Sequence, residues 1–247
     1  MLHKFEDGWF RFENGKRWRV KSPHYLCEIG SENNIPDYCK LASALANVRR
    51  VKAFYLGKLK FGKLDEFGTA VDILTANAMT ESLGTVPSPM DHSDLSKKLQ
   101  QTTGMDTGSK LDSIVRHIGN SKPTRYLERR EPGYINPINT PHRVSLGGHH
   151  MLISTALQIK GWSKAPDKEA RITELVLTLP TQSLVAAQLA VDYFNKYYSL
   201  HHNQLPLLAA TYNAGSPRRT TQNDWNLVQY GEHIDRWITY YNTSRKV

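Results

Sequence analysis

The chain has 247 residues, 39% of them hydrophobic, enough for one sizeable domain or one domain with a small appendage. No apolar run approaches the roughly 20 residues that span a bilayer, and the amino terminus lacks the apolar core of a signal peptide. We therefore expect synthesis in the cytoplasm and no membrane span. The formal net charge of +9 indicates a polyanionic partner, either nucleic acid or an anionic bacterial envelope.

The first sixty residues form a segment of their own in the sequence pattern. Residues 1–23 are predicted to be extended, because Asn14-Gly15 lies between two alternating aromatic runs, the signal of a β-hairpin. The hairpin aromatics either pack onto the rest of the protein or bind cell wall. Cys27 and Cys39 fit no metal-ligand spacing and are either reduced thiols or a disulfide.

The remainder of the chain is predicted to be mainly helical. A polar stretch up to about Ser109 and a proline-containing stretch over 119–146 are predicted as loops. The predicted helices begin near Asp37 and cover about 66–83, 111–118, 148–158, the run after Pro180-Thr181, LPLLAATYN, and the region from about His233. The fold class is therefore mainly α with a small amino-terminal β element, divided into residues 1–60 and a domain over 61–247.

One carboxylate continues an apolar stripe on the helix EFGTAVDILTANAMTESLG. Its apolar positions recur at steps of three and four, and the next position on that face is Glu81. Burial disfavours the charged form of a carboxyl group and so raises its pKa, which is what a general acid for glycoside cleavage needs. Since Gly84 follows closely, we expect Glu81 in the last turn of the helix, at the edge of a cleft. The alternative is a glutamate that reaches solvent at a fraying helix end.

Three short motifs occur in a fixed order along the chain. They are Glu81-Ser82 at a helix end, Ser145-Leu-Gly-Gly-His-His150 opening a helix, and Tyr212-Asn213-Ala-Gly ending another. Together they resemble the lytic transglycosylases and goose-type lysozymes, especially the phage-encoded cell-wall lysins of that group. The resemblance covers about residues 65–240, including the closing run DWNLVQYGEHIDRW.

The resemblance implies a lysozyme-like fold in which Glu81 is the catalytic acid. It implies that Tyr212 and Asn213 pack beside the acid and contact substrate with Ser82, and that Ser145, Gly147 and His150 form part of the sugar groove. The chain departs from the family at His150, where glutamine is usual, and at Gly148-His149, where Leu-Met is usual.

A second departure is the long insertion between Gly84 and Ser145, which contains RYLERREPGYINP. Its carboxylates are either a solvated charge cluster or include a second catalytic group, Glu131, opposite Glu81. In the second case Tyr134 would stack on a sugar ring.

These motifs predict an enzyme that cleaves the β-1,4 bond between N-acetylmuramic acid and N-acetylglucosamine in peptidoglycan. The favoured reaction is non-hydrolytic transglycosylation by a phage endolysin or virion-associated lysin, acting in the periplasm or from the virion. The alternatives are a hydrolytic muramidase that uses Glu131, and a non-catalytic protein that binds nucleic acid or cell wall. We expect a monomer. We also expect no metal or other cofactor, because no His-Glu-x-x-His or Cys-x-x-Cys motif occurs.

Overall fold

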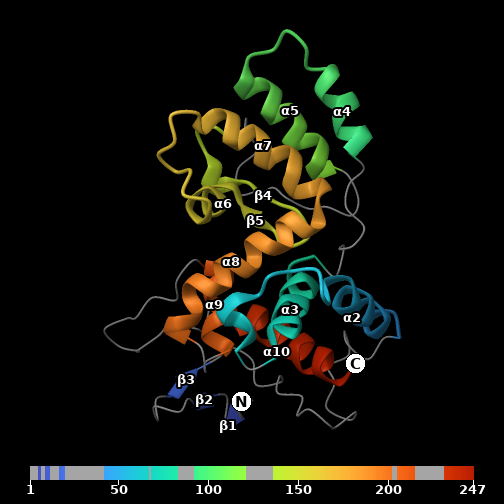
Figure 1. Ribbon diagram of the computed structural model, residues 1–247, viewed down its shortest axis with the longest axis vertical. Helices are drawn as coiled ribbons and strands as arrows, with labels where there is room; N and C mark the ends of the chain where they lie inside the picture. Colours follow the sequence, from blue (N-terminus) through green and yellow to red (C-terminus); the bar gives the residue numbers. More distant parts are fainter. Residues whose placement is uncertain are drawn as a thin grey trace. The chain divides into compact units, whose positions relative to one another are not determined.

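The computed structural model describes residues 42–66, 68–82, 92–120, 136–201, 205–214 and 231–247, together with strand residues 5–6, 9–11 and 17–19. These residues are mainly helical with small antiparallel β elements, which confirms the predicted fold class (Figure 1). The chain forms two compact units. The first comprises Met1–Leu83 and Tyr193–Val247, and the second comprises Gly84–Asp192.

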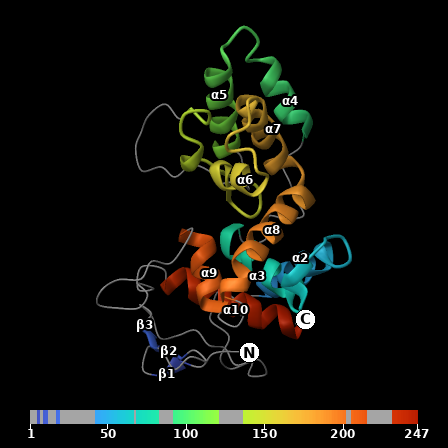
Figure 2. The ribbon, with the colours of Figure 1, turned by 60° about the vertical axis from the view of Figure 1, so that its left-hand side comes forward.

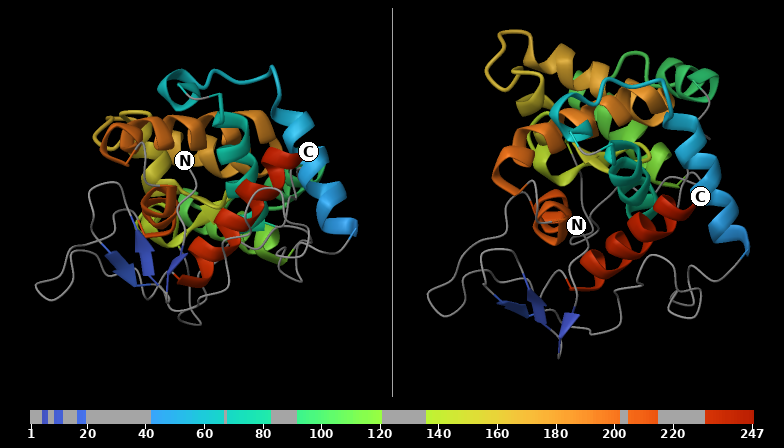
Figure 3. Two further views of the ribbon diagram at one scale, coloured as in Figure 1. Left: turned by 90° about the horizontal axis from the view of Figure 1, so that it is seen from below. Right: turned by 60° about the horizontal axis from the view of Figure 1, so that its bottom comes forward.

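The first unit is built around α3 (Ala70–Ser82). The helix α10 (Gly231–Lys246) packs along α3 and also contacts α2 (Ala42–Tyr55) and α9 (Leu205–Ala214), as Figure 3 shows from two further directions. Because neighbours surround α3, residues 72–80 are all buried, polar ones included. The predicted single apolar stripe therefore understates the burial of this helix, and Val71 on that stripe is only half-buried.

The start of α3 differs from the prediction of a helix from Glu66. A short 3-10 turn, η2 (Gly62–Asp65), comes first, and Gly68 then has a φ of +63°. That left-handed conformation breaks a helix, so α3 begins only after it, with Ile73 N–H donating to the Thr69 carbonyl oxygen at 3.0 Å.

A buried ion pair joins three helices of the first unit. Lys52 Nζ from α2 lies 2.9 Å from Asp72 Oδ1 on α3, and it also donates to the carbonyl oxygen of Ser244 on α10 at 2.7 Å. The Ser244 hydroxyl donates to the same Asp72 oxygen at 2.6 Å. Each polar group is thus satisfied by another helix, which orients α2 and α10 on α3.

Side-chain hydrogen bonds tie η2 to α8 (Ser183–His201), which runs from the second unit into the first. Asn195 Oδ1 accepts from the Leu64 N–H at 2.8 Å, and Asn195 Nδ2 donates to the Phe61 carbonyl oxygen at 2.8 Å. One amide side chain therefore satisfies two loop backbone groups.

The amino-terminal sheet has the strand order β1 (Phe5–Glu6), β2 (Trp9–Arg11) and β3 (Arg17–Arg19). The strands β2 and β3 pair antiparallel with Phe10 opposite Trp18, which confirms the predicted pairing. The turn residues Asn14-Gly15 lie outside the described residues. The division into 1–60 and 61–247 stays a prediction, and α2 packs on α3 across residue 60.

The second unit contains a helical layer that the sequence pattern predicted only in part. The helices α4 (His92–Gln100), α5 (Thr107–Asn120) and α7 (Lys168–Thr181) lie side by side (Figure 2). The helix α4 occupies a stretch predicted as a polar loop. It forms because Leu95, which is 1% exposed, anchors its one apolar face. The helix α7 was not predicted, whereas the predicted helix after Pro180-Thr181 is confirmed as α8, beginning at Ser183.

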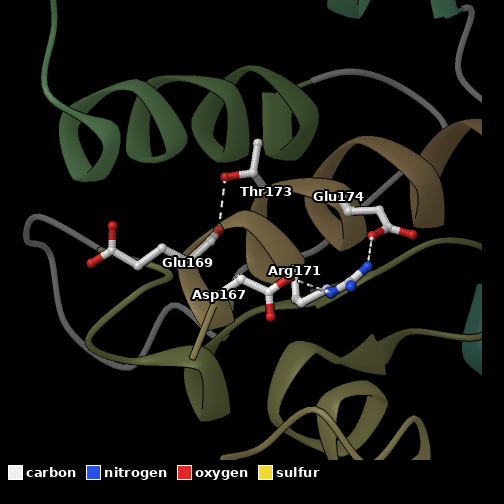
Figure 4. Close-up of polar contacts among 5 residues, drawn as sticks. All are labelled: Asp167, Glu169, Arg171, Thr173 and Glu174. Carbon is white, nitrogen blue, oxygen red and sulfur yellow. Dashed lines mark hydrogen bonds and ion pairs between the residues drawn. The ribbon is translucent and has the colours of Figure 1, made fainter. Parts of the chain in front are cut away.

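Charged side chains surround the first turns of α7 (Figure 4). Arg171 Nε lies 3.0 Å from Asp167 Oδ2, and Arg171 Nη1 lies 3.2 Å from Glu174 Oε2. The guanidinium carbon of Arg171 also stands 4.7 Å from the ring centre of Trp162, in the connection before the helix. These half-exposed contacts fix the entry into α7, although exposed ion pairs contribute only about 0–1 kcal/mol each.

Among the described helices, no single one is long and apolar enough to cross a membrane. The helix α7 and residues Ser183–Tyr198 pass that test of length and composition only as a pair bent by 109°.

Candidate functional site

Glu81 is the penultimate residue of α3, in the last turn of the helix as predicted. Its side chain is 14% exposed, so the carboxyl group is mostly withdrawn from water. The neighbouring Ser82 hydroxyl donates to the Ala78 carbonyl oxygen at 3.0 Å, one turn earlier. The serine therefore satisfies a carbonyl at the helix end, in addition to the substrate contact that the resemblance implies.

The end of α9 brings Tyr212 to the carboxyl group of Glu81. Burial, followed by the negative charge of Glu81, holds the pKa of the Tyr212 phenol well above 10, while a hydrogen bond with Asn77 acts to lower it. Asn77 lies one turn before Glu81 on α3. Two motifs that are far apart in the sequence, Glu81-Ser82 and Tyr212-Asn213, are thus close together in the first unit.

Aromatic packing holds Tyr212 in this position. The ring of Phe194 stacks on it with the centroids 5.0 Å apart, and the ring of Tyr193 meets it edge-on at 5.2 Å. The Tyr193 hydroxyl in turn donates to the carbonyl oxygen of Thr211 at 2.8 Å. The phenol beside Glu81 therefore has a defined place and needs little reorganisation to act.

His233, in the first turn of α10, is a further residue of this cluster, and it was not predicted. Its Nε2 lies 3.8 Å from Glu81 Oε1, and its Nδ1 lies 3.4 Å from Asn213 Nδ2. Burial lowers the pKa of His233, the charge of Glu81 acts to raise it, and the charge of Arg236 acts to lower it. The ring is therefore a second titratable group at the end of α3.

A signal for His233 is present in the sequence. The histidine precedes the fully buried Trp237 by one turn and Tyr240 by two turns, so it shares their face of α10. A histidine on the apolar face of a helix is a candidate partner for a buried carboxylate, but the choice of partner depends on how α10 packs on α3.

The predicted groove residues Ser145, Gly147 and His150 lie in the second unit, in and beside a short β-hairpin. The strands β4 (Ser145–Leu146) and β5 (Met151–Leu152) pair antiparallel, and α6 (Ile153–Ile159) follows them directly. The prediction of a helix from Gly148 is therefore wrong at its start. Gly147 and His150 have φ values of +76° and +44°, which turn the chain between the strands instead.

His149, which precedes His150 in this turn, is buried. Burial, together with the charge of His150, lowers the pKa of His149 to about 3, so its ring stays neutral at neutral pH. Where the resemblance would place a glutamine, the chain thus has a half-buried histidine, His150, beside the fully buried His149.

Gly147 also has a packing role. A Cβ atom at this position would overlap the carbonyl oxygen of Leu179 and lie 3.4 Å from the Ala186 Cβ. The glycine is therefore required where the hairpin touches the end of α7, whatever its contact with substrate.

We expect Gly147→Ala to destabilise the protein more than Gly161→Ala. Both glycines have positive φ values, +76° and +72°, but only the Cβ at Gly147 meets other atoms, since nothing lies within 4 Å at Gly161. The clash adds about 1–3 kcal/mol to the strain that both variants share. Urea unfolding of the two variants gives this difference, and equal losses of stability would contradict the packing role.

Two predicted residues, Glu131 and Tyr134, lie outside the described residues, and their roles stay predictions. Within the described ranges, no group of three or more histidine, cysteine, aspartate or glutamate side chains is arranged to hold a metal ion. Metal independence likewise stays a prediction.

Comparison with known proteins gives no match: no protein-family model, curated protein or solved structure matches the chain. The resemblance to lytic transglycosylases rests on the three motifs and on their order.

Proposed function

We propose that the chain degrades peptidoglycan by cleaving the β-1,4 bond between N-acetylmuramic acid and N-acetylglucosamine, with Glu81 as the general acid. The observation that carries this proposal is the meeting of Glu81 and Tyr212 at adjacent helix ends, with Asn213 beside them. This proximity of two of the three motifs that carry the resemblance supports the proposal.

The surroundings of Glu81 suit proton transfer to a leaving oxygen. A glycosidic bond breaks readily only when its oxygen receives a proton, and a positioned carboxyl group supplies that proton. Glu81 is held at a helix end with a 14% exposed side chain, beside a phenol that burial keeps neutral. The exposed Asn213 next to it can meet an acetamido group of the substrate.

Among the motifs that carry the resemblance, Glu81 is the only carboxylate, which favours a reaction without water. Glu81 protonates the glycosidic oxygen, and the acetamido oxygen of N-acetylmuramic acid attacks the anomeric carbon as the bond breaks. The ionised Glu81 then accepts the proton of the sugar's 6-hydroxyl, whose oxygen closes an anhydro ring and displaces the acetamido oxygen. Glu81 regains its proton, and no water is consumed. In the hydrolytic alternative, Glu131 would activate a water molecule.

The sugar groove is assigned in part to Ser145, Gly147 and His150, where the histidine ring donates to a sugar hydroxyl in place of the family's glutamine. The net charge of +9 supports binding to the anionic envelope. The protein then works as a phage endolysin or a virion-associated lysin.

Clearing of purified peptidoglycan tests the proposal. The full chain should lower the turbidity of a wall suspension and release soluble fragments. Strongly salt-dependent binding to duplex DNA with an unchanged wall suspension would instead identify a nucleic-acid-binding protein.

A further inference from the structure

Glu81 and His233 form a close pair between two helices that pack along each other. The side chains are 14% and 10% exposed, and 3.8 Å separates Glu81 Oε1 from His233 Nε2. Nε2 is buried and makes no hydrogen bond to any residue in the described part of the chain. The carboxyl group of Glu81 is therefore the polar group that this edge of the ring faces.

The helix α9 holds the ring from other directions. Asn213 Nδ2 lies 3.4 Å from His233 Nδ1, and the backbone of Ala209, one turn earlier on α9, hydrogen-bonds the ring. The imidazole is therefore fixed between α9 and the carboxyl group and has little freedom to turn away from it.

Titratable groups near the ring come from three helices. Glu81 on α3 acts to raise the pKa of His233, and Arg236 on α10 itself acts to lower it. Tyr212 on α9 is a further titratable group beside Glu81, and burial, followed by the charge of Glu81, raises the pKa of its phenol well above 10, so it stays neutral. Glu81 and Arg236 are thus the groups whose charges act on the ring of His233.

We propose that His233 is a positioning residue for Glu81, whose ring holds the carboxyl group in place at the end of α3. This inference rests on the proposed function of Glu81.

The effect on activity follows from the loss of this contact. In His233→Gln the ring no longer lies against the carboxyl group of Glu81, so the proton donor is held less firmly in place. We expect the rate of peptidoglycan clearing by His233→Gln to fall by about 10-fold through lost positioning.

The matched control is His117→Gln, the same change at a histidine that pairs with Asp94 in the second unit. It should clear peptidoglycan at the wild-type rate. A folded His233→Gln protein that clears peptidoglycan at the wild-type rate would overturn the inference.

A titration by NMR separates this inference from the proposed function and does not require the His233→Gln protein to be active. Among ten histidines, the His233 signal is assigned by its absence in His233→Gln. Glu81→Gln removes the negative charge that acts to raise the His233 pKa, so the ring should titrate at lower pH in that variant. If His233 titrates at the same pH in Glu81→Gln as in the wild type, and the wild type clears cell wall through Glu81, the pairing alone is refuted. If His233 titrates at lower pH in Glu81→Gln, but the wild type does not clear cell wall, the pair is upheld and the proposed function is refuted.

Discussion

Replacing Glu81 by glutamine should lower the rate of peptidoglycan clearing by at least ~100-fold. Glutamine keeps the shape and the hydrogen-bonding capacity of the side chain, but it cannot deliver a proton to the glycosidic oxygen. The measurement is the initial rate of turbidity loss with purified peptidoglycan. Because Glu81 is at the end of α3 and not in its fully buried middle, the thermal unfolding of the variant should stay close to that of the wild type.

The matched control is Glu174→Gln, the same change at an exposed glutamate on α7 whose contact is an ion pair with Arg171. It should clear cell wall at the wild-type rate. A folded Glu81→Gln protein with near-normal clearing would remove Glu81 from the reaction.

The second large effect concerns stability. Lys52→Met should lower the free energy of unfolding by about 3–5 kcal/mol, because it leaves the carboxylate of Asp72 buried without its cation. The side chain of Asp72 is only 7% exposed, so little water reaches the carboxylate in place of the lysine. The measurement is urea or thermal unfolding of the full chain.

Two further variants separate the charge from the loss of packing. The double variant Lys52→Met/Asp72→Asn should recover part of the loss, since an asparagine can accept from Ser244 and carries no charge. Lys246→Met, at an exposed lysine near the end of α10, should change stability by about 0.5 kcal/mol or less. A Lys52→Met protein as stable as Lys246→Met would show that the ion pair contributes nothing.

The sequence pattern predicted the elements whose apolar residues repeat over several turns. The helices α8 and α9 begin or end near the predicted residues, since a long periodic run is a strong signal. The helix α4 was missed because serines and glycines on both sides of it resemble a loop, and a short helix depends on its packing against α5.

Only part of the candidate site was predicted from the sequence. The positions of Glu81 and Tyr212 at helix ends follow from apolar spacing and from helix-ending residues, and both are confirmed. The pairing of Glu81 with His233 depends on the packing of α10 along α3, which no local pattern specifies. The prediction of a helix from Gly148 is wrong at its start, because the positive φ of His150, which turns the chain there, is not visible in the residue types.

The mass of the soluble products is the most direct test of the central claim, that Glu81 alone cleaves peptidoglycan without water. Digestion of purified peptidoglycan by the wild-type chain, followed by mass spectrometry, separates the two reactions, since hydrolysis adds one water to each cut and ring closure adds none. We predict muropeptides that end in anhydro-N-acetylmuramic acid and that are still formed by Glu131→Gln. Muropeptides with free reducing ends, together with an inactive Glu131→Gln protein, would contradict the account.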